Sequence, residues 1–434
     1  MADLRSEFVG IKSPNPFWLA SAPPTDKEVN VVRAFKAGWG GVVWKTLGED
    51  PPVVNVAGPR YGAIHSGDRR LIGLNNIELI TDRELQVNLE EIKRVKRDWP
   101  DRALVVSLMV PCEQHNWEAI LHAVEETECD GVELNFGCPH GMSERGMGSA
   151  VGQVPEYIEM VVRWCKATTR MPVIVKLTPN ITDIRYPARA AKKGGGDGVS
   201  LINTINSITN VDLDNFAPVP TIDGKGSHGG YCGPAVKPIA LSMVSEIARD
   251  AETRGLPISG IGGVTTWRDA AEFLALGATN VQVCTAVMTY GFKIVSEMIS
   301  GLSGYLDDKQ MSLSDLVGRA VPNVSDWQYL NLNYVTKARI DQDLCIKCGR
   351  CHIVCEDTSH QAITATKDGQ RYFEVVDSEC VGCNLCVNVC PVEDCITMEQ
   401  ITTGTDPHTG APATGYRNWT EHPNNPSCMV PAGE

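Results

Sequence analysis

The sequence predicts a (β/α)8 TIM barrel followed by a smaller, cysteine-rich domain. Eight short apolar segments alternate with eight segments of helical periodicity across residues 16–302. Nine of the 16 cysteines lie between positions 345 and 395. With 434 residues, of which 43% are hydrophobic, the chain is long enough to form about two or three domains with large cores.

Net charge and the N-terminal residues narrow the class of protein. A net charge of −14 argues against nucleic acid or an anionic membrane as a partner. No apolar run approaches the ~18 residues of a membrane-spanning helix, and the first ten residues lack the apolar core of a signal peptide. We therefore expect a cytoplasmic protein, in which clustered cysteines bind metal instead of forming disulfides.

The predicted barrel begins after a short strand or hairpin at residues 4–11. Its strands are predicted at residues 16–22, 40–47, 103–110, 130–136, 172–178, 197–203, 257–263 and 280–287. None of these segments has the character of an edge strand, which favours a closed barrel over an open doubly wound sheet.

Helices are predicted between the strands, and several end at a glycine placed as a C-terminal cap, such as Gly38, Gly194, Gly255 and Gly277. The helical segments are residues 26–37, 82–98, 116–128, 155–168, 184–193, 237–254, 266–275 and 290–302. This pattern places the barrel at residues 1–303, a helical connector at 304–333, the cysteine-rich domain at 334–400 and an irregular or disordered tail at 401–434.

The cysteine-rich domain contains two runs of identical spacing, C-x2-C-x2-C-x3-C. In two-cluster ferredoxins the fourth cysteine of each run ligates the other cluster. This predicts one 4Fe–4S cluster on Cys345, Cys348, Cys351 and Cys390, and a second on Cys380, Cys383, Cys386 and Cys355. A pair of zinc sites is the alternative, although zinc requires neither the third cysteine nor the x3 partner.

The first run departs from the usual pattern at one position, and the remaining cysteines lie outside both runs. Cys355, the last cysteine of the first run, is followed by Glu356, where bacterial ferredoxins usually have proline. Cys395 is expected to pack as a small apolar side chain. No ligand spacing is present around Cys112, Cys129, Cys165, Cys232 or Cys428.

Iron–sulfur clusters carry single electrons, so a second cofactor is needed for two-electron chemistry at carbon. Flavin exchanges electrons in both ways. Phosphate groups bind after strands 7 and 8 of such barrels, where this chain has Ile261-Gly262-Gly263 and Cys284-Thr285. We therefore predict FMN, with glycines that only form turns as the alternative.

Two lysines, Lys45 and Lys176, end predicted barrel strands. A lysine buried there loses hydration unless it faces an anion. Because reduced flavin is anionic around its N1 and C2 oxygen, either lysine is a candidate to stabilise it. A lysine side chain that extends to solvent is the alternative.

Residues 133–148, ELNFGCPHGMSERGMG, bring a carboxamide, a thiol and an imidazole to the end of the fourth predicted strand. Catalytic residues of TIM barrels lie at this end of the strands. We predict that Cys138, beside His140, is a general acid or base and that residues 141–148 form a lid. A buried structural cysteine is the alternative.

Further polar residues are predicted at the same end of the barrel: Asn75, Asn76, Glu78, Asn203 and Thr204. Converging amides suit a planar ring with alternating donors and acceptors, such as a pyrimidine. Residues 224–229 match a dinucleotide-binding glycine motif but follow no predicted strand and precede no helix. They predict a mobile loop, and no NAD site is expected in this chain.

Together these residues resemble the dihydropyrimidine dehydrogenase family. The resemblance spans residues 5–400 and includes NPFWLASA, GLNNIELIT, ELNFGCPHGMSERGMG, VKLTPNITDI, INTIN, GGYCGPAVKPIAL and the paired cysteine runs. It implies a dihydroorotate-dehydrogenase-like barrel with FMN, followed by a ferredoxin-like α+β domain with two 4Fe–4S clusters. The implied reaction is the reversible reduction of uracil or thymine to its 5,6-dihydro form.

The resemblance also implies roles for individual residues. Cys138 would donate a proton to pyrimidine C5 while FMN passes hydride to C6. The implied pyrimidine contacts are Asn76, Glu78, Asn135, Phe136, Gly137, Asn203 and Thr204. The implied FMN contacts are Ser21, Lys45, Thr46, Lys176, Gly233, Ile261, Gly262, Gly263, Cys284 and Thr285. The animal enzyme has a substrate-contacting serine at the position of Gly137, so this sequence departs from it there.

The animal enzyme carries an N-terminal half that binds FAD and NADPH, and this sequence has no counterpart of it. The resemblance therefore implies a separate subunit, similar to the bacterial subunit called PreT, that binds FAD and NAD(H) in an α2β2 heterotetramer. Dihydroorotate dehydrogenase is one alternative, against which stand Glu78, His140 and the fused cluster domain. A non-catalytic electron-transfer subunit is the other.

Overall fold

The computed structural model describes the chain except for residues 1, 49–54, 140–145, 406–410 and 427–434. It forms two compact units, Met1–Val324 and Ser325–Glu434. Among the described residues, no helix combines the length and the apolar character needed to cross a bilayer.

The first unit is a closed barrel of parallel strands in the order β10-β15-β16-β3-β4-β7-β8-β9. Each strand lies within its predicted segment, so the predicted barrel is confirmed. Every residue in these strands is buried, as expected for parallel strands covered on both faces. The strands are β3 (Phe17–Leu19), β4 (Gly41–Leu47), β7 (Ala103–Leu108), β8 (Gly131–Asn135), β9 (Val173–Lys176), β10 (Gly198–Leu201), β15 (Ile258–Ile261) and β16 (Asn280–Val283).

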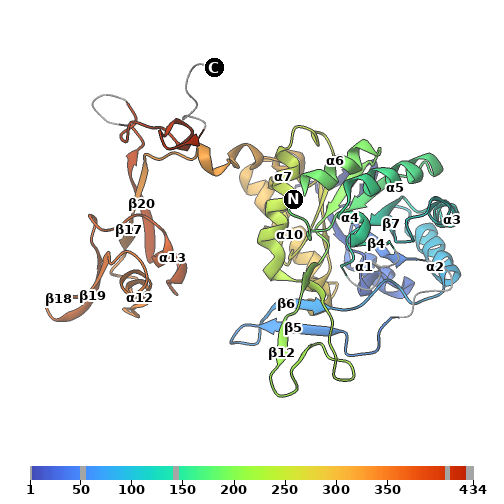
Figure 1. The fold of residues 1–434 in the computed structure, drawn as a ribbon, viewed down its shortest axis with the longest axis horizontal. Helices are drawn as coiled ribbons and strands as arrows, with labels where there is room; N and C mark the ends of the chain where they lie inside the picture. The colour runs from blue at the N-terminus through green and yellow to red at the C-terminus, as the bar shows by residue number, and fades with distance from the viewer. Residues whose placement is uncertain (1, 49–54, 140–145, 406–410, 427–434) are drawn as a thin grey trace. The chain divides into compact units, whose positions relative to one another are not determined.

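Helices surround the strands (Figure 1). They are α1 (Glu28–Ala37), α2 (Leu85–Asp98), α3 (Gln114–Glu125), α4 (Ser149–Gly152), α5 (Pro155–Thr168), α6 (Arg185–Lys193), α7 (Lys237–Arg249), α8 (Trp267–Ala275), α9 (Thr285–Tyr290), α10 (Ile294–Lys309) and α11 (Leu313–Leu316). Gly38 caps α1 in the left-handed conformation, with φ 115°. Gly194 does not adopt it; a Cβ there would lie 2.8 Å from Cβ of Val162, so close packing explains this glycine.

An antiparallel hairpin, β1 (Ser6–Phe8) and β2 (Ile11–Ser13), precedes the barrel where a strand or hairpin was expected. Phe8 packs edge-on against Trp18, with ring centroids 5.9 Å apart. Phe8 and Ile11 form one buried cluster with barrel residues of β3, β4, β7 and β9. The hairpin therefore closes the barrel beneath its strands, and the opposite, carboxyl ends remain open for a site.

Two long loops add strands beyond the carboxyl ends of the barrel. The loop after β4 contributes β5 (Tyr61–His65) and β6 (Leu71–Asn76), and the loop after β10 contributes β11 (Ile205–Ser207) and β14 (Gly229–Cys232). They form one antiparallel sheet, β11-β14-β6-β5, and a small hairpin of β12 (Asn210–Asp212) and β13 (Ala217–Val219) lies between β11 and β14 in sequence. Gly229, the last residue of the predicted glycine loop, begins β14.

The second unit consists of two pairs of antiparallel strands and two helices around a small core. β17 (Tyr334–Ile340) pairs with β20 (Ile396–Thr403), and β18 (Ile363–Lys367) pairs with β19 (Gln370–Val375). The helices are α12 (Arg350–Glu356) and α13 (Leu385–Val389). Phe373, Ile363 and Ile396 form the core together with several of the cysteines.

The expected segment boundaries differ from the ends of the elements. Helix α10 continues past residue 303, and β20 continues past residue 400. Short 3-10 helices are η1 (Pro23–Thr25), η3 (Pro234–Val236), η4 (Val321–Asn323), η5 (Trp327–Tyr329) and η6 (Trp419–Glu421). In the tail, Trp419 contacts Trp327 with ring centroids 6.1 Å apart, and Asn333 donates to the carbonyl of Tyr416 at 2.8 Å.

Candidate active site and cluster sites

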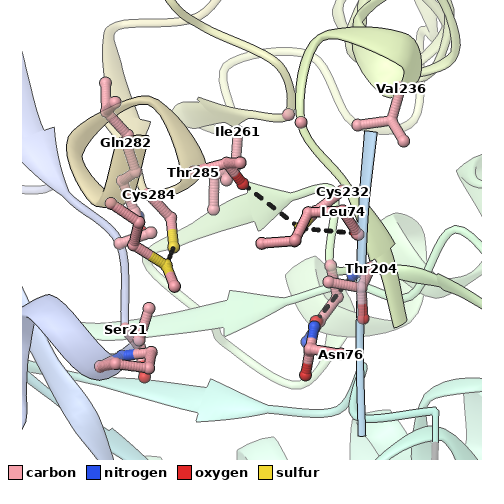
Figure 2. A pocket seen from close by; sticks show the side chains of 18 of the residues that line it. Ser21, Leu74, Asn76, Thr204, Cys232, Val236, Ile261, Gln282, Cys284 and Thr285 are labelled. Atoms are coloured by element: carbon pink, nitrogen blue, oxygen red, sulfur yellow. Dashed lines mark hydrogen bonds between the residues drawn. The ribbon is translucent and has the colours of Figure 1, made fainter. Parts of the chain in front are cut away.

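A large pocket lies at the carboxyl ends of the barrel strands. It encloses about 1310 Å³, counting the part open to solvent. Among the described residues predicted to bind substrate or cofactor or to act in catalysis, all line this pocket except Asn75, Phe136 and Gly137. In the view of Figure 2, Ser21 and Cys284 lie on one side of the pocket and Asn76 and Thr204 on the other. The sequence pattern thus located the pocket, and the structure adds its geometry.

One end of the pocket is built from glycine backbone. Gly233, Gly262 and Gly263 have φ of 92°, 128° and 73°, in the left-handed region that favours glycine. A Cβ at position 263 would lie 2.9 Å from the carbonyl oxygen of Gly233 and 3.0 Å from the backbone nitrogen of Lys237. Bare backbone at the start of α7, with Thr285 opening α9 nearby, forms a surface suited to a phosphate.

Hydroxyl groups and one amide connect four strands at the floor of the pocket. Thr46 Oγ1 lies 3.1 Å from Ser21 Oγ and 2.9 Å from Ser107 Oγ. Asn135 Nδ2 donates to the same Thr46 oxygen at 3.1 Å. Thr46 lies in β4, Ser107 in β7 and Asn135 in β8, and Ser21 follows β3 by two residues. The network therefore fixes the ends of these four strands relative to one another.

Both predicted lysines line the pocket, and each already faces a carboxylate of the chain. Lys45 Nζ lies 2.6 Å from Glu78 Oε1 and 3.6 Å from Asp26 Oδ2. Lys176 Nζ lies 3.4 Å from Oε1 of the fully buried Glu133. These carboxylates offset part of the cost of burying the ammonium groups.

Glu78 is held by two donors. Tyr61 donates its hydroxyl to Oε2 of Glu78, while Lys45 donates to Oε1. Burial alone would raise the pKa of Glu78, but the hydrogen bonds from Lys45 and Tyr61 lower it below its ordinary value. Glu78 therefore places a fixed negative charge in the pocket wall at neutral pH.

Each of the predicted pyrimidine-binding amides is held by a hydrogen bond, and Asn135 and Asn203 are bonded to each other. Asn203 Nδ2 donates to Asn135 Oδ1 at 2.9 Å, and the backbone of Thr204 donates to Asn203 Oδ1 at 2.8 Å. On the inserted sheet, Asn76 Nδ2 donates to the carbonyl of Gly230 at 3.0 Å. These bonds fix which amide atoms face the cavity.

Cys138, three residues after the end of β8, lines the pocket. His140 and residues 141–145 of the predicted lid lie outside the described residues. Phe136 points away from the pocket and packs edge-on against Trp117, with ring centroids 5.9 Å apart. At Gly137 a Cβ would lie 2.4 Å from Cβ of Asn203, so the close approach of Asn203 leaves no room for a side chain there.

The structure adds pocket residues that the sequence pattern did not indicate: Tyr61, Tyr231, Cys232 and Gln282. Gln282 offered a signal, since it is a polar residue inside the apolar strand β16. The other three lie on the inserted sheet, whose short strands give no long periodicity. Burial raises the pKa of the Cys232 thiol, which lies between Thr285 and the carbonyl of Leu74 (Figure 2), and raises that of Cys284 to about 12.

The cysteine-rich unit contains two small cavities, each lined by four of the predicted cluster ligands. One is lined by Cys345, Cys348, Cys351 and Cys390. The other is lined by Cys355, Cys380, Cys383 and Cys386. In each cavity the fourth cysteine comes from the other run. Cys395, predicted to pack as an apolar side chain, is buried and also lines the first cavity.

The missing proline after Cys355 has a local structural consequence. Cys390 precedes Pro391, has an extended backbone with ψ 126°, and follows the end of α13. Cys355 precedes Glu356 and stays inside α12. The chain then turns through hydrogen bonds from the backbones of Ser359 and Gln361 to the carbonyl of Cys355, so the departure leaves the thiol at its cavity.

This combination defines a TIM-barrel oxidoreductase fused to an iron–sulfur domain. The dihydroorotate dehydrogenase family model matches residues 3–306, and the model for the 4Fe–4S dicluster domain matches residues 338–398. The chain belongs to the dihydroorotate dehydrogenase family and, within it, to the group that contains the dihydropyrimidine dehydrogenases. The 4Fe–4S match favours clusters over the alternative of zinc.

Three relatives illustrate the range of similarity. The NAD-dependent dihydropyrimidine dehydrogenase subunit PreA of Escherichia coli K12 is 44% identical over 400 residues, which cover 92% of this chain and 96% of PreA. The chloroplastic dihydropyrimidine dehydrogenase (NADP(+)) of Arabidopsis thaliana is 43% identical over 321 residues, 71% of this chain and 75% of the relative. The catalytic subunit of dihydroorotate dehydrogenase B (NAD(+)) from Pyrococcus abyssi is 38% identical over 326 residues, which cover 73% of this chain and 99% of the relative.

A solved structure shares the fold of the barrel. The dihydroorotate dehydrogenase of Eimeria tenella, in complex with ferulenol, superimposes with a TM-score of 0.58 at 19% identity. The match covers 73% of this chain and 88% of that one.

Proposed function

We propose that this chain is the catalytic subunit of a dihydropyrimidine dehydrogenase that reversibly reduces uracil and thymine to their 5,6-dihydro forms. Similarity to PreA over 92% of the chain supports this assignment. The observation that carries it is the charge of the pocket wall. Among the described lining residues the only cations are Lys45, which is paired with the lining residue Glu78, and Lys176, which is paired with the buried Glu133.

Dihydroorotate dehydrogenase is the second candidate, supported by the Pyrococcus relative. Its ring substrate carries a carboxylate, which uracil and thymine lack. In this pocket that carboxylate would enter beside Glu78 and compete with it for Lys45, and like charges in a partly buried site repel strongly. The pocket therefore favours a neutral pyrimidine.

The residues of the pocket fit FMN. Gly233, Gly262 and Gly263 would hold its phosphate through bare backbone, and Lys45 and Lys176 supply positive charge near the floor. Also assigned to FMN are Ser21, Thr46, Ile261, Cys284 and Thr285, which line the same pocket. When bound, FMN supplies hydride transfer to and from carbon.

The chain itself supplies orientation and a proton. Asn76, Asn135, Asn203 and Thr204 bind the polar edge of the pyrimidine, and Glu78 accepts from a ring N–H. Cys138 donates the proton that C5 gains during reduction and recovers it in the reverse direction. Phe136 and Gly137 act by shaping the turn that carries Cys138, because neither residue lines the pocket.

Electrons enter through the two clusters, from an FAD- and NAD(H)-binding partner similar to PreT in an α2β2 assembly in the cytoplasm. The naming of the E. coli relative as a subunit supports a partner. We place one cluster on each of the two four-cysteine cavities. These ligand sets agree with the crossed pairing of the two runs.

The test uses the purified full chain, reconstituted with FMN, iron and sulfide and supplied with electrons from reduced methyl viologen. Uracil and thymine are expected to accelerate viologen oxidation, and orotate is expected to leave it at the background rate. Orotate turnover without uracil turnover would assign the chain to the dihydroorotate reaction. No turnover with either, in protein that retains both cofactors, would leave only an electron-transfer role.

A further inference from the structure

We propose that Tyr61 is a positioning residue of the pyrimidine site, which acts by fixing the carboxylate of Glu78. This inference rests on the proposed function and adds a residue that recognises no substrate atom directly. Tyr61 lines the pocket from the inserted sheet, outside the barrel strands that carry most of the site.

The geometry holds Glu78 from two directions. Tyr61 is the first residue of β5 and pairs with Asn76 of β6. Asn76 precedes Glu78 by two residues in the chain. Its hydroxyl donates to Oε2 of Glu78. Lys45 of β4 donates to Oε1 at 2.6 Å, so each carboxylate oxygen has a donor from a different element. A carboxylate fixed at both oxygens cannot rotate without breaking one of these bonds.

The backbone keeps the two residues in place. The amide of Ile77 donates to the carbonyl of Arg60 at 3.0 Å, which continues the pairing of β5 with β6 up to Glu78. Tyr61 and Glu78 therefore lie at the same end of one hairpin. The orientation of the Glu78 carboxylate therefore depends on the position of the β5–β6 hairpin at the pocket.

The charged groups around Glu78 come from several elements. Lys45 of β4 lies closest, Arg60 before β5 lies 3.8 Å from Oε1, and Asp26 after η1 shares Lys45 at 3.6 Å. Asp82 lies 4.0 Å from Arg60. Burial and the neighbouring Glu78 charge raise the pKa of Tyr61 above its ordinary value, so its hydroxyl remains a donor throughout the working pH range.

Removing the hydroxyl has a defined consequence. In Tyr61→Phe the carboxylate keeps Lys45 but loses the bond from Tyr61 at Oε2, and we expect it to turn toward Lys45 and away from the ring. A hydrogen bond to a charged group is lost, so the dissociation constant of uracil is expected to rise about 10-fold. The rate of the chemical step should change by less than about 3-fold, because Tyr61 touches no reacting atom.

The pH profile separates positioning from a structural role. The Tyr61 hydroxyl is one of the groups that lower the pKa of Glu78. Its loss is expected to move the acidic limb of kcat/KM for uracil to higher pH, because the carboxylate then becomes protonated sooner on acidification. Simple loosening of the hairpin would lower activity at every pH alike.

The experiment is a double-mutant cycle in the full, cofactor-loaded chain, with uracil binding measured by perturbation of the flavin spectrum. Tyr61→Phe, Glu78→Gln and the double variant are compared, with Tyr157→Phe on the exposed face of α5 as the matched control. We expect Tyr61→Phe to weaken binding in the wild-type background and to add less than about 2-fold in Glu78→Gln. Equal effects in both backgrounds, or wild-type affinity in Tyr61→Phe, would overturn the proposal. Absence of uracil binding by the unmodified chain would instead contradict the proposed function.

Discussion

The ammonium nitrogen of Lys45 lies 2.6 Å from Oε1 of Glu78, and the exposed fractions of the two side chains are only 6% and 12%. The pair connects the second barrel strand to the inserted sheet that covers the mouth of the pocket. In the proposed function, this pair sets the charge that the pyrimidine ring meets. Removing either member leaves the other with a more distant ion-pair partner, Asp26 at 3.6 Å for Lys45 and Arg60 at 3.8 Å for Glu78.

Glu78→Gln tests how this pair selects the substrate. The variant loses the negative charge and leaves Lys45 with Asp26 at 3.6 Å. We expect kcat/KM for uracil to fall about 10- to 100-fold, since hydrogen bonds to charged groups are worth about 1.5–3 kcal/mol. Orotate should bind more tightly than to the wild type, because Lys45 can then pair with its carboxylate.

Steady-state kinetics with uracil and equilibrium titration with orotate measure both effects. Glu90→Gln, on the exposed side of α2, is the control for the same chemical change away from the pocket. If Glu78→Gln binds orotate no better than the wild type does, the charge of Glu78 is not what excludes it.

The glycine backbone of the phosphate region predicts a specific loss of FMN. Gly263→Ala places a methyl group 2.9 Å from the carbonyl oxygen of Gly233. Gly224→Ala is a matched control, because Gly224 has a similar φ of 75° but open space around it. Both variants carry the backbone strain of alanine at positive φ, about 1–2 kcal/mol. Only Gly263→Ala obstructs the backbone surface predicted to hold the phosphate.

Flavin fluorescence after dialysis, together with melting temperatures, checks this prediction. Gly263→Ala should bind FMN at least about 10-fold more weakly, as expected when a backbone anion site is obstructed, while its clusters remain. Gly224→Ala should retain FMN with a comparable loss of melting temperature. Full FMN retention in Gly263→Ala would remove this loop from the phosphate site.

The two cysteine cavities predict which double variants keep a cluster. Cys345 and Cys390 line the same cavity, whereas Cys355 lines the other. Cys345→Ala/Cys390→Ala should therefore lose one cluster and keep roughly half of the iron, and Cys345→Ala/Cys355→Ala should lose nearly all of it. Iron analysis and the electron paramagnetic resonance spectra of the reduced protein measure the outcome. Pairing within each run predicts the reverse result for the two variants.

The barrel strands were predictable because each is buried on both faces and therefore appears as a short apolar run between helical periods. The inserted sheet was not predictable in this way. Its strands are three to six residues long. In β5, Tyr61 and His65 are exposed while Gly62 is buried, so the strand shows no continuous apolar run. Their pairing depends on contacts between loops that are more than 100 residues apart, such as Gly230 with Asn76.

Motif positions located the pocket residues but not the direction of each side chain. Asn135 faces the pocket while the next residue, Phe136, packs against Trp117, as expected when successive side chains at a strand end alternate. The steric role of Gly137 depends on the approach of Asn203, which follows β10 and is 66 residues further along the chain. Likewise, the partners of the two pocket lysines, Glu78 and Glu133, follow from tertiary contacts.

We propose that a neutral pyrimidine is reduced in this pocket with Cys138 as the proton donor. The most direct measurement is the reoxidation of the pre-reduced flavin of the chain by saturating uracil in a stopped-flow instrument, for the wild type and Cys138→Ala. Loss of a general acid should slow this single turnover by about 10²- to 10⁴-fold, with the uracil dissociation constant and the cluster spectra unchanged. Equal reoxidation rates in the two proteins would contradict the claim.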